Sequence, residues 1–185
     1  MKLILKNVRL SFPDLFTAVQ YQGAGPFSYR CSLLVPSASA TRKQIDAAIL
    51  EVAKEKWAAK AEAVMKKAAA GKQGICFTDG DAKEYDGYAD HWVLTATKSQ
   101  DKGRPDIRDR DGKTPLTVED GKPYAGCFVN AVLDLWAQDN QFGQSVRCTL
   151  VGLQFAKDGE AFSGGAVITD GDFEELGEDA DGDMA

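Results

Sequence analysis

Apolar and polar residues alternate in several short stretches of the chain, which is the pattern of half-buried β-strands. Residues 3–12 (LILKNVRLSF) and 29–35 (YRCSLLV) flank a turn rich in Gly and Pro, so they predict a first hairpin. The same alternation recurs at 91–99, 126–138 and 144–155. The last two stretches are separated by DNQFG, whose residues favour a turn, so they predict a second hairpin.

One long segment between these strands has helical spacing instead. From residue 41 to residue 70, apolar side chains such as Ile49 and Val52 recur at intervals of three and four, among many Ala, Lys and Glu residues. Gly71 follows the last periodic residue and predicts the end of the helix. Trp57 lies on the apolar side of the helix, so we expect it to pack against the body of the protein.

These elements favour a mainly β fold with one long inserted helix. Several short strands, one helix between them and long loops are typical of a small antiparallel barrel like the OB-fold. We expect this domain to span residues 1–162. Residues 163–185 form a Gly-rich linker and an acidic tail, in which residues 170–185 include eight Asp or Glu and no Lys or Arg. A segment of this composition has too little apolar surface to offset the conformational entropy that is lost on ordering, so the tail is predicted to be disordered.

The net charge of −6 hides an asymmetry. Because the tail carries eight of the 28 acidic residues and none of the 22 basic ones, residues 1–169 have a net charge of +2. A mildly basic body with an acidic arm is a signal of interaction with other charged molecules. No apolar run is long enough to span a membrane, and the N-terminus does not resemble a signal peptide, so we expect no membrane partner.

The sequence offers little for catalysis, cofactors or metals. It has four cysteines without a C-x-x-C pair, one histidine (His91), and neither a P-loop nor a dinucleotide-binding motif. We interpret the cysteines as free core thiols. The Asp-rich stretch TDGDAKEYDGYAD fails as a calcium loop, because Lys83 and Glu84 occupy positions that need an oxygen ligand and Gly. We therefore expect no enzyme activity, no cofactor and no metal, with carboxylate-based metal catalysis as an alternative.

Candidate binding residues lie on the second predicted hairpin. Strand alternation places Trp136 on the mixed face of 126–138, and it places Arg147 on the polar face of the partner strand. An aromatic ring and a guanidinium on an exposed barrel hairpin suit single-stranded nucleic acid, because bases stack on the ring and phosphates meet the cation. The alternative is a partly covered aromatic beside a solvated charge. Further aromatic candidates for stacking are Tyr124, Phe128 and Phe142.

The segment 98–113 is rich in charge of both signs. Its cationic candidates for phosphate contacts are Lys98, Arg104, Arg108 and Arg110. Interleaved aspartates nearly cancel them, so a solvated loop with weak ion pairs is the alternative to the edge of a phosphate-binding groove.

Seven motifs occur in an order that resembles a known family. They are NVRLSFPDLF, YRCSLLVP, TDGD, GYADHWVLTATKS, GRPDIRDRDG, YAGCFVNAVLDLWA and DGEAFSGG. The chain resembles a phage family, long catalogued as a domain of unknown function, whose characterised members are single-stranded DNA-binding (ssDNA-binding) proteins. The family's arginine–proline element matches Arg104 and Pro105, and its aspartate and arginine match Asp109 and Arg110. Its aromatic–glycine–cysteine element matches Tyr124, Gly126 and Cys127.

This resemblance implies an OB-fold, a role in phage replication or recombination, a location in the host cytoplasm, and no enzyme activity. The implied partner is ssDNA, coated with little sequence preference by a monomer, a homodimer or a cooperative filament. The acidic tail could compete for the groove and recruit replication or recombination proteins. It differs from tails that end on an aromatic residue, because Phe173 precedes most of its acids. The alternative function is a structural or interaction protein of the virion whose tail binds a basic partner.

Overall fold

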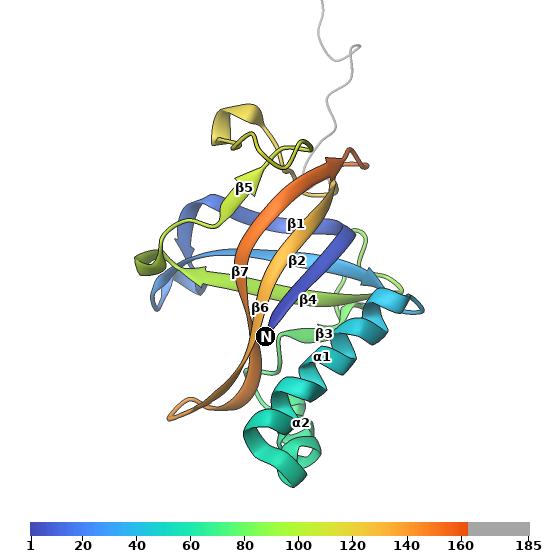
Figure 1. Ribbon diagram of the computed structural model, residues 1–185, viewed down its shortest axis with the longest axis vertical. Helices are drawn as coiled ribbons and strands as arrows, with labels where there is room; N and C mark the ends of the chain where they lie inside the picture. The colour runs from blue at the N-terminus through green and yellow to red at the C-terminus, as the bar shows by residue number, and fades with distance from the viewer. Residues whose placement is uncertain (163–185) are drawn as a thin grey trace, which may run out of the picture.

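The computed structural model describes residues 1–162, and the predicted tail lies outside the described residues. The fold is mainly β with a helical segment between strands, as predicted (Figure 1). The strands are β1 (Lys2–Gln20), β2 (Phe27–Pro36), β3 (Phe77–Asp79), β4 (His91–Ser99), β5 (Asp106–Arg108), β6 (Phe128–Asn140) and β7 (Gly143–Lys157). The helices are α1 (Ala40–Trp57) and α2 (Ala61–Ala70), with short 3-10 turns at Tyr21–Gly23, Ala58–Lys60, Gly80–Ala82, Gln100–Lys102 and Val118–Asp120.

The sheet closes into a barrel of five strands. Its strand order is β3-β4-β2-β1-β6-β7-β5, and an additional parallel pairing of Thr97 with Thr149 joins β4 to β7. This pairing brings two strands together that are distant in the sequence. It therefore brings outward-facing side chains of β4 and β7 onto the same surface of the barrel.

Strand β1 is longer than the predicted stretch 3–12, because it bends and pairs with two neighbouring strands. Its first part pairs with β6 and its second part with β2. The register shifts near Asn7 and Phe12, both of which have positive φ (55° and 45°). Irregularities of this kind bend a strand and increase its twist, which lets β1 wrap around the barrel.

The predicted helical segment is confirmed, with a break at Ala58. Ser39 caps α1 by accepting a hydrogen bond from the Arg42 amide at 3.2 Å. Ala58 leaves the helical region with φ 49° and ψ −123°, and α2 starts three residues later. Trp57 at the break is buried as expected, and its indole N–H donates to the Asp139 carboxylate at 3.0 Å. This break could not be predicted from the residue type, because Ala is the strongest helix former.

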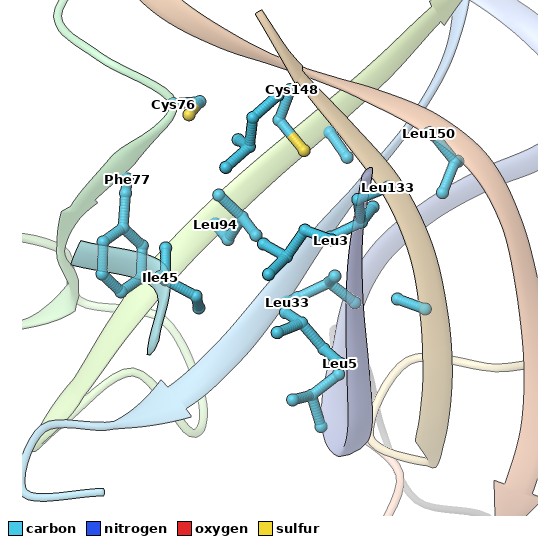
Figure 2. Packing of buried hydrophobic residues seen from close by; sticks show 14 of the residues in the cluster. Leu3, Leu5, Leu33, Ile45, Cys76, Phe77, Leu94, Leu133, Cys148 and Leu150 are labelled. Carbon is cyan, nitrogen blue, oxygen red and sulfur yellow. The ribbon is translucent and has the colours of Figure 1, made fainter. Parts of the chain in front are cut away.

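The core fills the inside of the barrel and extends under α1. Figure 2 shows leucines from β1, β2, β4, β6 and β7 converging, with Ile45 of α1 and Phe77 of β3 beside them. The predicted inner face of β6 is confirmed, because Val129, Ala131, Leu133 and Leu135 are fully buried. The outward face of the same strand is then free to carry the polar and aromatic side chains of a binding surface.

The four cysteines are buried free thiols, as predicted. Burial disfavours the thiolate and raises the pKa of Cys31 and Cys76 to about 12 and that of Cys127 to about 11. Burial also raises the pKa of Cys148. Among the described residues, no helix is both long and apolar enough to cross a membrane.

Candidate nucleic-acid interface

A hollow of about 570 Å³ lies on the outside of the barrel where β4 and β7 meet; we call it the central groove. Its lining comes from strands β2, β3, β4, β6 and β7, from the 3-10 turn before β2, and from the connections on either side of β3. Its charged side chains are Arg30, Lys72, Lys83 and Arg147, and within the described part of the chain its lining has no carboxylate. Its other lining residues are Tyr21, Gln73, Ile75, Cys76, Thr78, Thr95, Thr97, Trp136, Gln138 and Cys148.

Trp136 lies in the groove, facing outward as predicted. Its side chain is 42% exposed, and it is paired across the hairpin with Arg147. The indole N–H donates to the Thr149 hydroxyl at 3.1 Å, which fixes one edge of the ring. A ring held at its edge while partly exposed is suited to stacking with a flat aromatic ligand.

Arg147 is held by neutral partners only. Its Nε donates to Gln138 Oε1 at 3.0 Å, and its terminal nitrogens donate to Gln73 Oε1 at 3.1 Å and to the Gln73 carbonyl at 3.4 Å. None of the ion pairs in residues 1–162 involves Arg147. The guanidinium is therefore oriented while its charge stays available for an anion such as a phosphate.

Arg30 and Tyr21 form a second aromatic–cation pair in the groove. The Arg30 guanidinium lies 4.8 Å from the centre of the Tyr21 ring, which is 59% exposed. Asp14 is the cross-strand partner of Arg30, and burial raises the pKa of its carboxyl while Arg30 lowers it. The positive charge of Arg30 is thus partly compensated by the Asp14 carboxyl on the neighbouring strand.

Tyr21, Arg30, Lys72 and Lys83 were not among the candidates predicted from the sequence. They come from three separate segments, and only the closed barrel places them around Trp136. For Tyr21 and Arg30 a signal was present, because both flank the Gly-rich turn of the first hairpin, YQGAGPFSYR. Lys72 and Lys83 had no signal beyond their charge.

The predicted basic segment lies outside the central groove, and half of its cations are engaged locally. Arg108 forms an ion pair with Asp106 at 2.6 Å and donates to the Gly112 carbonyl at 3.0 Å. Lys98 donates to the Arg104 carbonyl at 3.2 Å. Arg104 and Arg110 are exposed. Their contacts with phosphate remain a prediction.

The three other predicted aromatics occupy different places. Tyr124 donates to the Asp158 carboxylate at 2.7 Å and so fixes the end of the described chain. Phe128 lies between Lys157 and Arg9, at 4.7 and 5.8 Å from its ring centre. Phe128 is eight residues from Trp136 along β6, or roughly 26 Å at the usual rise of a strand. Phe142 is 67% exposed at the tip of the β6–β7 hairpin.

Comparisons with known proteins identify relatives of the whole chain. A family model described as "Enterobacter phage Enc34, ssDNA-binding protein" matches residues 1–185. Protein p50 of Acyrthosiphon pisum secondary endosymbiont phage 1 is 43% identical over 178 residues, covering 95% of this chain and 94% of that protein.

Two solved structures share the fold. The ssDNA-binding protein of bacteriophage Enc34, in complex with ssDNA, has a TM-score of 0.71 at 25% identity, covering 88% of this chain and 89% of that one. The ssDNA-binding protein gp2.5 of bacteriophage T7 has a TM-score of 0.56 at 17% identity, covering 89% and 91%. The second likeness concerns the fold alone.

Proposed function

The chain belongs to the family of the Enterobacter phage Enc34 ssDNA-binding protein, and we propose that it is itself a phage protein that binds ssDNA. It coats single strands in the host cytoplasm during replication or recombination, with little sequence preference and without enzyme activity. The observation that carries this proposal is the central groove, which combines Trp136 with four cationic side chains and lacks a carboxylate within the described residues.

The groove contains the two components that sequence-tolerant ssDNA binding needs. Trp136 and Tyr21 offer rings to bases, whose flat faces are common to all four nucleotides. Arg30, Lys72 and Arg147, together with Lys83, offer cations to the phosphates. Because stacking and phosphate contacts are common to all four nucleotides, we expect weak discrimination between sequences.

The test is a titration of fluorescently labelled oligo(dT) at several salt concentrations, with and without Mg²⁺. If the four groove cations each neutralise one phosphate, log K should fall with log salt with a slope of about −3. A flat response, or no binding, would overturn the proposal in favour of a structural virion protein. Loss of the oligonucleotide only with Mg²⁺ would show a nuclease instead.

A pair of variants locates the site. Replacing both Arg30 and Arg147 with Gln should make the slope shallower by about 1.4, since each contact on a single strand contributes about 0.7. The matched control replaces two lysines outside the groove, Lys54 of α1 and Lys60 of the following 3-10 turn, with Gln and removes the same charge. Equal slopes for the two double variants would exclude the groove as the binding surface.

A further inference from the structure

A second hollow, of about 450 Å³, opens beside the central groove, between α2 and the β6–β7 hairpin; we call it the hairpin hollow. Both elements lie at the same end of the barrel (Figure 1). The hairpin hollow shares Lys72, Gln73, Gln138 and Arg147 with the central groove. The two hollows are therefore continuous, with the Arg147 guanidinium at their junction.

The lining of the hairpin hollow resembles that of the central groove in chemistry. Lys67 and Lys72 add positive charge, and Phe142 adds an exposed aromatic ring at the hairpin tip. Val64 and Ala68 provide an apolar floor. Among the described residues that line it, none is a carboxylate. Lys67 also lies in the last turn of α2, where it offsets the negative end of the helix dipole.

The nearby carboxylate of Asp139 is already engaged. It accepts a hydrogen bond from Trp57 Nε1 at 3.0 Å and another from Gln144 Nε2 at 3.3 Å. These two bonds, the one from Trp57 first, lower the pKa of Asp139. Asp139 thus directs its charge toward α1 and the hairpin.

The segment that lines both hollows after α2 is held in place by the barrel. Ser145 donates to the Gly74 carbonyl at 2.9 Å, and the Cys76 amide donates to the Val146 carbonyl at 3.1 Å. These bonds fix the connection after α2 against β7. As a result, Gln73 stays within reach of Arg147 and both hollows keep their shape.

We propose that bound ssDNA continues from Trp136 past Arg147 into the hairpin hollow. There a base stacks on Phe142, and the backbone passes Lys67 and Lys72. This inference rests on the proposed function, because it extends the same strand. Trp136 lies four residues before Asn140, the last residue of β6, about 13 Å at the usual rise of a strand, and Phe142 lies in the turn that follows. A short oligonucleotide can fill the central groove alone, and a longer one engages both hollows.

The experiment compares short and long oligo(dT), of about 4 and about 16 nucleotides, the range that one OB-fold covers. The variants are Lys67→Glu and Phe142→Ala. Lys66→Glu is the matched control, because Lys66 is the exposed neighbour on the same helix and does not line the hollow. We expect both variants to weaken binding of the long oligonucleotide about fivefold or more, with unchanged binding of the short one. The control should lose clearly less.

Two outcomes would overturn the extended path. If Lys67→Glu and Lys66→Glu weaken long oligonucleotides equally and Phe142→Ala has no effect, the strand leaves the protein at Trp136. The proposed function would survive that result, because the unmodified protein would still bind both lengths. Failure of the unmodified protein to bind either length would overturn the proposed function and the path together.

Discussion

Replacing Trp136 with Ala tests the centre of the groove most directly. The ring is 42% exposed and lies in the hollow that also contains Arg147 and Arg30. A base stacked on an aromatic side chain contributes about 1–3 kcal/mol by alanine substitution. The dissociation constant for oligo(dT) should therefore rise by a factor of about 5 to 150.

The same substitution also has a cost in stability, because the ring is partly covered. An aromatic side chain buries about 150–250 Å² when fully covered, so Trp136 at 42% exposure buries roughly 90–150 Å². At about 25 cal/mol per Å² this corresponds to about 2–4 kcal/mol, an upper bound that Ala partly recovers. We expect the free energy of unfolding to fall by about 2 kcal/mol while the domain remains folded.

Two milder variants separate stacking from the hydrogen bond. Trp136→Phe keeps an aromatic face and loses the bond to Thr149, whereas Thr149→Val removes the acceptor and keeps the indole. Both should bind more tightly than Trp136→Ala. Intrinsic fluorescence gives a second signal, because Trp57 is buried and Trp92 lies under Arg42 at 4.1 Å. Quenching by ssDNA should largely disappear in Trp136→Phe.

Two outcomes would contradict a stacking role for Trp136. In the first, the Trp136→Ala protein shows a cooperative unfolding transition, which proves that it is folded, and it binds oligo(dT) with an unchanged dissociation constant at two salt concentrations. The ring would then lie outside the path of the DNA. Undiminished quenching in Trp136→Phe would lead to the same conclusion. Binding lost by both Trp136→Ala and Thr149→Val to the same extent would indicate that the hydrogen bond, not the stack, matters.

Three further predictions concern other parts of the chain. Arg104→Ala should weaken binding equally for all sequences and make the salt slope shallower by up to about 0.7, and equal binding at several salt concentrations would exclude the loop. Deleting residues 170–185 changes the net charge from −6 to +2 and should tighten oligo(dT) binding, most at low salt; unchanged affinity would show that the tail does not compete for the groove. The four buried thiols should resist a thiol reagent at pH 8 in the native protein and react after unfolding, because burial raises their pKa values. Rapid labelling of the native protein would contradict this.

The barrel and the facing of its second hairpin could be predicted from the sequence, because strand alternation is a local property. Val129, Ala131 and Leu133 are inward and Trp136 is outward, as their period of two requires. The same argument placed Arg147 on the polar face of the partner strand, without its register. Their register, with Trp136 opposite Arg147, follows from the two-residue turn of the hairpin.

The rest of the groove depends on contacts between segments that are distant in the sequence. Lys72 and Lys83 flank β3, a strand of three residues that pairs with β4. They line the same groove as Trp136 because β4 bridges to β7 through Thr97 and Thr149. A strand this short has too little alternation to be predicted, and nothing in local spacing specifies a bridge of one residue pair.

Charge density along the sequence was a poor guide to the site, because it ignores compensation. The segment 98–113 has the densest run of cations predicted for phosphate, yet Arg108 is neutralised by Asp106. In the central groove the four cations face no carboxylate among the described lining residues. Compensation by carboxylates within the lining, not the number of cations in a stretch of sequence, therefore distinguishes the central groove from the segment 98–113.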